Sequence, residues 1–165
     1  MNMLKYAGIG SRETPQDVFN WMKSFGEWAA QNNLMLRSGG AKGADTAFEI
    51  GCNNSMGKKR IFRAENALKK KDWFELAAEF HPNWEACSDY AKRLHARNGA
   101  ILLGEDLKQP VDFVVCWTKD GKASGGTGQA LRIAASKGIP IFNVFNPGDF
   151  AALQVHLRMR GISHA

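Results

Sequence analysis

The sequence has little cysteine, and this limits how the chain can be held together. Cys52, Cys87 and Cys116 are odd in number, far apart and without a CxxC pair. Such spacing argues against a disulfide framework and against a zinc site, and free thiols are typical of a reducing compartment. The histidines show no metal-ligand spacing either. We therefore expect a cytoplasmic protein with no bound metal and no cofactor.

Long hydrophobic runs are also missing. No apolar stretch approaches the roughly 20 residues that cross a membrane, and the first residues show no secretory pattern. The composition, 44% hydrophobic and 23% charged, is ordinary for a soluble globular protein and excludes collagen-like or low-complexity character. A chain of 165 residues is too short for two full α/β domains. We predict one domain over residues 1–165, with a helical segment at about 64–109.

Acidic residues are fewer than basic ones, which gives a formal net charge of +6. This excess favours an anionic partner, either a nucleic acid or a phosphorylated metabolite, although it also serves solubility alone. The basic residues are scattered along the chain, and only Lys69, Lys70 and Lys71 form a run. Charge alone therefore leaves the kind of partner open.

Glycine, in contrast, is abundant and concentrated where predicted strands end. The apolar run that begins at Leu34 stops at Ser38, Gly39 and Gly40, and a helical pattern begins after Gly43. Glycines let a ligand approach the backbone closely, and the free N–H groups at the start of the following helix attract anions. One such loop is a weak signal, because glycines also occur in ordinary turns.

Here the glycine pattern recurs after two further strands. One loop spans residues 8–12, GIGSR, and the other spans residues 124–128, SGGTG. In a parallel sheet these loops lie along one edge, and open α/β sheets bind ligands in the crevice beyond that edge. The pattern predicts a site for a nucleotide or a sugar phosphate.

The remaining elements follow from hydrophobic periodicity and turn residues. Helix signals begin at Thr14 and Pro15, and Gly138 closes a later helix. Because strand, helix and strand follow in close order, the strands must pair in parallel. We predict a Rossmann-like three-layer α/β sandwich with a mainly parallel central sheet. Predicted strands cover 4–9, 34–37, 59–62, 111–117 and 139–144, and predicted helices begin near 14 and cover 44–51, 127–137 and 149–160, with two or more in 64–109.

Taken together, these motifs resemble the SLOG superfamily of Rossmann-like nucleotide-binding proteins. The resemblance rests on GIGSR at 8–12, SGGAKGAD at 38–45, Arg97 with Asn98, and SGGTGQA at 124–130, and it spans residues 6–144. The superfamily includes the DNA-processing protein DprA (Smf), the cytokinin-activating LOG phosphoribohydrolases and small stand-alone bacterial or phage proteins. GGAKGAD is similar to the GGARGID loop of the DprA branch, and Arg97 with Asn98 is similar to its RNR element.

The chain departs from the LOG pattern at the catalytic glutamate. Aligning SGGTGQA with PGGxGTxxE places Arg132 at the glutamate and Ser124 at the proline. Any hydrolysis of a nucleoside-phosphate N-glycosidic bond would need another acid. Asp45 and Glu49 are four residues apart on one helical face, so they are the loop-adjacent candidates, with Arg97 near the scissile bond. The alternative for both acids is a structural or solvent-exposed position.

Three functional hypotheses follow. The first is a nucleotide-binding protein, with or without LOG-like nucleoside 5'-monophosphate hydrolase activity; the second is a non-catalytic sensor or sequestering protein for a signalling nucleotide. The third is a DprA-like single-stranded DNA-binding protein. The resemblance also implies a homodimer or higher homo-oligomer. Candidate ligand-binding residues are Gly8, Gly10, Ser11, Arg12, Ser38, Gly39, Gly40, Gly43, Asn98, Trp117, Ser124, Gly125, Gly126, Thr127 and Gly128.

Overall fold

A computed structural model describes residues 3–162 and contains a five-stranded sheet in which every pair of neighbours is parallel. The strand order is β3-β2-β1-β4-β5, so the chain starts in the middle of the sheet and builds outward in both directions. This is the order of a Rossmann-like fold, and it confirms the predicted fold class. The strands are β1 Lys5–Gly8, β2 Met35–Ser38, β3 Lys59–Ile61, β4 Phe113–Cys116 and β5 Ile141–Asn143.

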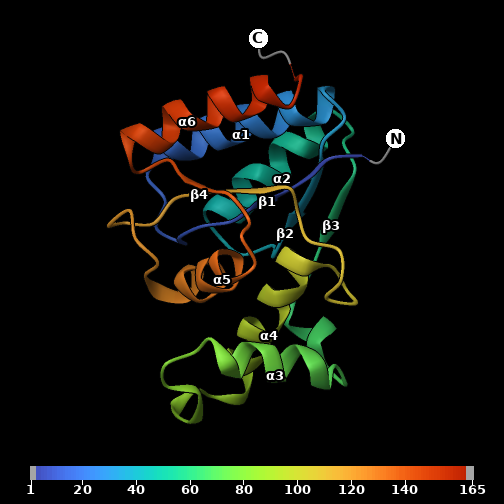
Figure 1. The fold of residues 1–165 in the computed structure, drawn as a ribbon, viewed down its shortest axis with the longest axis vertical. Coiled ribbons are helices and arrows are strands. Elements are labelled where there is room, and N and C mark those ends of the chain that lie inside the picture. The colour runs from blue at the N-terminus through green and yellow to red at the C-terminus, as the bar shows by residue number, and fades with distance from the viewer. Residues whose placement is uncertain (1–2, 163–165) are drawn as a thin grey trace.

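Helices cover both faces of this sheet, as Figure 1 shows. Helices α1, α2 and α6 pack on one face, and α4 and α5 pack on the other, with α3 lying against α4 at the outer end. The helices are α1 Gln16–Gln31, α2 Ala44–Asn54, α3 Lys71–Glu79, α4 Asp89–Leu103, α5 Gly125–Ser136 and α6 Pro147–Met159, with short 3₁₀ turns at Ala64–Ala67 and Trp84–Ala86.

The two hydrophobic cores follow from the alternation of side chains along each strand. In β1, Tyr6 packs with α1 and α2, whereas Ala7 packs toward α4 and α5. In β4, Phe113 contributes to the first core and Val114 to the second. Successive side chains of a strand point to opposite faces, so a sheet that is covered on both sides needs apolar residues at every position. That requirement makes 111–117 the clearest strand in the sequence.

Local details differ from the sequence-based expectation at helix starts. Thr14 does not cap α1: its hydroxyl donates to the Ser11 carbonyl at 2.7 Å, and Pro15 occupies the N-cap position. The glycines at 125–128 form the first turn of α5 instead of a separate loop before it. Among residues 3–162, no helix combines the length and the apolar character needed to cross a membrane.

Candidate functional site

A cavity of about 640 Å³ opens at the carboxyl edge of the sheet. Its walls come from the loops after β1 and β4, from the N-terminus of α5 and from one side of α4. Strands β1 and β4 are neighbours from which the chain proceeds in opposite directions across the sheet, and this switch point is where Rossmann-like folds bind ligands. The lining residues that carry the argument below are Arg12, Glu13, Asp45, His95, Arg97, Asn98, Lys119, Ser124, Gly125, Gly126 and Thr127.

The N-terminus of α5 forms an exposed wall made largely of backbone. Gly125 has a φ of +65°, a left-handed conformation that side-chain-bearing residues rarely adopt. A Cβ at Gly125 or at Gly126 would meet no other heavy atom within 4 Å, so the main chain here is open to a ligand. Because the first N–H groups of a helix lack partners within it and carry the positive end of its dipole, this wall suits an anion.

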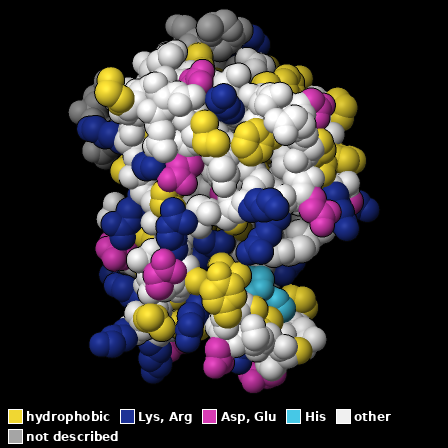
Figure 2. All heavy atoms as spheres, turned by 180° about the vertical axis from the view of Figure 1, so that it is seen from behind, with side chains coloured by type: hydrophobic (Ala, Val, Ile, Leu, Met, Phe, Trp, Pro, Cys, Tyr) yellow, Lys and Arg dark blue, Asp and Glu magenta, His cyan; other side chains and the backbone are white. Residues whose placement is uncertain are grey.

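Two exposed basic side chains, Arg12 after β1 and Lys119 after β4, line the same cavity. Figure 2 shows Lys and Arg side chains gathered across the middle of the molecule, next to histidine side chains drawn in cyan. The cavity therefore combines exposed positive charges with backbone N–H donors at the start of α5. Arginine is suited to bidentate contact with a phosphate, whereas lysine acts as a point charge.

Arg97 is a different case, because its guanidinium is buried and already engaged. Its Nη1 donates to the carbonyl of Gly39 at 2.7 Å and to that of Phe62 at 2.9 Å, and its Nε donates to the Asn98 side chain at 2.9 Å. Burial lowers the pKa of Arg97, and the nearby Asp45 acts in the opposite direction. The side chain therefore ties α4 to the ends of β2 and β3.

Asp45 is buried at the start of α2 and borders the cavity. Its Oδ2 accepts the backbone N–H of Gly39 at 3.1 Å and that of Ala41 at 3.4 Å, so it fixes the loop after β2. Burial raises the pKa of Asp45 to about 6, and the charge of Arg97 and the backbone donors only partly oppose this shift. A carboxylate held in this way organises the cavity wall.

A chain of buried hydrogen bonds continues from Arg97 behind the cavity. Asn98 donates through Nδ2 to the Gln129 side chain at 3.1 Å, and Gln129 in turn donates to the Ala77 carbonyl at 3.3 Å. Asn98 and Gln129 are buried, and the bonds join α4 to α5 and α3. Buried polar side chains that satisfy one another hold their helices in a defined arrangement.

The structure brings many of the predicted residues together around this cavity and places others behind it. The cavity is lined by Gly10, Ser11, Arg12, Asp45, Arg97, Asn98, Ser124, Gly125, Gly126 and Thr127. The residues that do not line it are Gly8, Ser38, Gly39, Gly40, Gly43, Glu49, Trp117 and Gly128.

Glu49 requires a correction. Its carboxylate forms a salt bridge with Lys59 Nζ at 2.8 Å, which directs it toward the start of β3. Asp45 does line the cavity, so the expectation that both acids look into one crevice is not met. One turn separates them along α2, but the loop after β2 encloses only Asp45, at the first turn. Glu49 therefore lies outside the cavity lining and pairs with a lysine of β3.

The other residues outside the cavity have structural contacts. Ser38 is buried and its hydroxyl donates to the Gly8 carbonyl at 2.6 Å, joining β2 to β1. Trp117 is only 8% exposed and packs against Phe145, so it presents no open face for stacking on a base. Gly43, with a φ of +89°, lies against the Ser11 carbonyl, where a Cβ would come within 2.4 Å.

Some lining residues were absent from the sequence-based set. Glu13, His95, Thr118 and Lys119 all line the cavity. The signal for Glu13, Thr118 and Lys119 was their position within a few residues of a strand end. His95 comes from the middle of α4, and only its place one helical turn from Asn98 indicated it.

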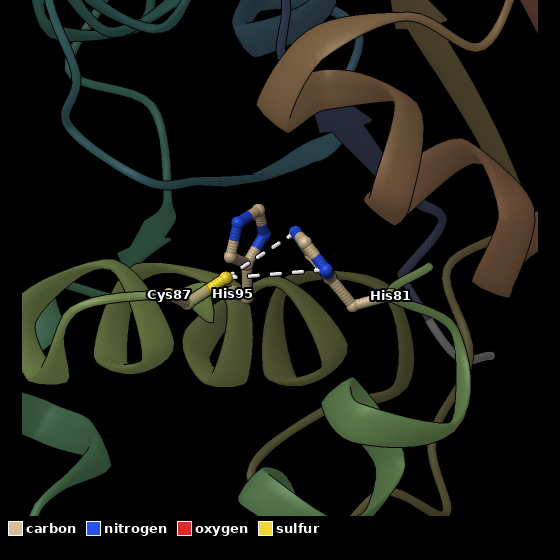
Figure 3. Close-up of side chains that lie close together, drawn as sticks. All are labelled: His81, Cys87 and His95. Atoms are coloured by element: carbon tan, nitrogen blue, oxygen red, sulfur yellow. Dashed lines mark hydrogen bonds between the residues drawn. The ribbon is translucent and has the colours of Figure 1, made fainter. Parts of the chain in front are cut away.

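The structure also gathers three possible metal ligands that the sequence spacing did not indicate. The ligand atoms of His81, Cys87 and His95 all lie within 4.8 Å of one another, as Figure 3 shows. The residues are six and eight positions apart, which is not a recognised motif spacing, so only folding reveals the group. A further histidine, His164, lies outside the described residues.

The fold is that of a Rossmann-like α/β protein with a cavity at the carboxyl edge of its parallel sheet. No family model matches the chain, and no curated protein matches it significantly. Its fold is similar to that of DNA processing protein A from Helicobacter pylori, studied for its single-stranded DNA binding mode, with a TM-score of 0.56 and 22% identity. It is also similar in fold to DprA from Streptococcus pneumoniae, with a TM-score of 0.53 and 18% identity.

These likenesses cover 85% and 86% of this chain but only 64% and 50% of the respective DprA chains. This chain therefore spans less than two thirds of the length of either neighbour. At such low identity the comparison establishes a shared fold.

Proposed function

We propose that this protein binds single-stranded DNA, with a backbone phosphate held at the N-terminus of α5. The observation that carries the proposal is the open backbone of Gly125 and Gly126 facing a cavity that Arg12 and Lys119 also line. Fixed N–H donors hold one phosphate, and the exposed cations accompany the strand on either side. The net charge of +6 and the fold shared with DprA proteins support this function.

Binding is favoured over hydrolysis because the acids proposed for catalysis are engaged or remote. Asp45 is occupied by backbone N–H groups and Glu49 by Lys59. Arg97 donates to main-chain carbonyls. Among the lining residues, Glu13 is the exposed carboxylate, so it is the remaining candidate for a general acid or base.

The second candidate function is binding of a free nucleotide, with or without cleavage of its N-glycosidic bond. A volume of about 640 Å³ supports this candidate, since small-molecule sites commonly span roughly 300–1,000 Å³. The same phosphate position would serve both ligands. A nucleotide sensor or a LOG-like hydrolase, as the SLOG resemblance implies, belongs to this candidate.

The experiment is a fluorescence anisotropy titration of a labelled oligothymidylate with the wild type and with Arg12→Ala and Lys119→Ala. We expect each substitution to weaken binding about tenfold, in the range for a hydrogen bond to a charged group. Each should also reduce the slope of log affinity against log salt by about 0.7, the value for one phosphate of a single strand. Arg158→Ala is the matched control, because Arg158 is exposed at the end of α6 and does not line the cavity.

The outcome separates the candidates. DNA affinity that is insensitive to salt, or that falls equally with Arg158→Ala, contradicts a strand held in the cavity. A thermal shift with nucleoside phosphates but not with oligonucleotides favours the second candidate. Chromatography for released base, repeated with Glu13→Gln, then separates a nucleotide binder from a hydrolase.

Homodimerisation remains a proposal that the SLOG resemblance implies. Phe150, Val155 and Met159 of α6 are 40%, 45% and 83% exposed, so this helix offers apolar side chains to a second copy. A light-scattering measurement of mass at micromolar concentration tests it. A monomer mass contradicts the proposal.

A further inference from the structure

A second site lies on the wall of the cavity, where the segment between α3 and α4 folds against α4. His81 and Cys87 come from that segment, and His95 projects from α4 toward them, as Figure 3 shows. We propose that these three side chains bind a divalent metal ion of the zinc type. The proposal does not depend on which ligand the cavity binds, although His95 also lines the cavity.

The geometry is close to that of a tetrahedral site. Zinc bonds of about 2.0–2.3 Å in a tetrahedron place neighbouring ligand atoms about 3.6 Å apart. The Cys87 sulfur lies 3.5 Å from His81 Nε2, and the rings of His81 and His95 have their centroids 4.5 Å apart. All three ligand atoms lie within 4.8 Å of one another. Coordination therefore requires side-chain shifts on the order of 1 Å, well within rotamer adjustment.

The donor set also suits zinc. Imidazole nitrogen and thiolate sulfur are the ligands that this borderline-soft ion prefers, and three protein ligands leave a position for water or another group. His95 Nδ1 is buried without a hydrogen-bond partner, which is costly for a polar atom and leaves a lone pair available. A metal bond to this nitrogen would remove that cost.

His81 makes one contact that coordination would change. Its Nδ1 accepts the backbone N–H of Asn83 at 3.0 Å, so the neutral ring carries its proton on Nε2. Binding through Nε2 moves the proton to Nδ1 and breaks that hydrogen bond. Asn83 is exposed, so water replaces the lost partner at little cost.

The position of the ion gives it a role in the cavity as well as in the fold. Bound between the two segments, it would fasten residues 81–87 to the middle of α4. Because His95 also lines the cavity, a metal bond to its ring would fix one residue of the cavity wall. The site is therefore placed to connect metal loading with the shape of the cavity wall.

Metal content and cobalt spectroscopy test the proposal. The full-length protein, purified without chelator, is analysed for zinc by mass spectrometry, then stripped and titrated with Co²⁺. We expect one equivalent of metal, a thiolate-to-cobalt charge-transfer band and tetrahedral d–d bands. Cys87→Ser should abolish the charge-transfer band, and His81→Asn should weaken Co²⁺ binding at least tenfold. Cys52→Ser and His156→Asn are the matched controls, because both residues lie outside the cluster.

A second readout does not depend on the variants folding well. Iodoacetamide should alkylate Cys87 of the metal-free wild type faster than the buried Cys52 and Cys116, and Zn²⁺ should protect Cys87 until a chelator is added. Absence of protection at saturating Zn²⁺ overturns the proposal. So does a cobalt spectrum that is the same in the wild type and in Cys87→Ser.

Discussion

Asp45 and Arg97 hold opposite sides of a single residue. Asp45 accepts the backbone N–H of Gly39 at 3.1 Å, and Arg97 donates to the carbonyl of the same residue at 2.7 Å. Both side chains are buried, and each charge stabilises the other across that peptide. The glycine loop after β2 is therefore held in place behind the cavity.

Replacing Gly39 tests this arrangement. A Cβ there would lie 2.5 Å from Arg97 Nη1 and 2.9 Å from Asp45 Oδ2, so one of these side chains must move. We expect Gly39→Ala to lower the free energy of unfolding by about 1–3 kcal/mol, the usual cost of overpacking, as measured by urea denaturation. Gly148→Ala in α6 is the control, because its Cβ meets nothing within 4 Å. Equal stability of the two variants contradicts the account.

The burial of Asp45 predicts a pH dependence of stability. Its pKa in the folded protein is raised from 3.8 to about 6, so the folded state holds the proton more tightly than the unfolded state. The contribution is fully present below pH 3.8 and is lost as the pH rises through about 6. We expect the wild type to lose up to about 3 kcal/mol over this window relative to Asp45→Asn, which cannot ionise. Parallel pH profiles of the two proteins would show that Asp45 titrates normally.

Ser38 should matter for stability and not for ligand affinity. Its hydroxyl donates to the Gly8 carbonyl in the core, between neighbouring strands. Ser38→Ala should therefore cost about 1–2 kcal/mol in thermal or urea unfolding, with the dissociation constant of the folded protein unchanged. If Ser38→Ala loses much of its affinity for the ligand at a temperature where it is folded, Ser38 contributes to the ligand site.

Gly126, in contrast, should matter for ligand affinity and not for stability. Its backbone is exposed at the start of α5, and a Cβ meets no atom of the protein within 4 Å. Gly126→Ala should leave stability the same or raise it by up to about 1 kcal/mol, because alanine favours a helix. The methyl group occupies the approach of a phosphate, so affinity for an oligonucleotide should fall at least tenfold. Retained affinity, equal to that of Gly148→Ala, would place the phosphate elsewhere.

The sequence predicted the fold because its signals are local. The buried run at 111–117 follows from side-chain alternation, and the glycine-rich stretches after β1, β2 and β4 follow from turn chemistry. Both signals limit where the strands can begin and end. The parallel pairing of the strands followed from the β–α–β order alone. A short stretch of sequence determines these properties, whatever packs against it in the folded protein.

The contacts around the cavity depended on segments that are distant in sequence. Arg97 is 58 residues from the Gly39 carbonyl that it binds, so its anchoring role had no local signature. Glu49 is directed by its salt bridge with Lys59, and Lys59 belongs to a different element, strand β3. His81 and His95 meet only because the segment between α3 and α4 turns back on the helix. Pairings of this kind arise from tertiary packing.

The hydrogen bonds that link Gly39, Arg97, Asn98, Gln129 and Ala77 are complete without a ligand. The loop after β2 and helices α3, α4 and α5 therefore lose their conformational freedom on folding, before any binding event. Association with the cavity is preorganised, so it should be fast and should change the backbone little. Arg12 and Lys119 are exposed, so we expect the proposed ligand to restrict their side chains more than the buried Arg97 and Asn98.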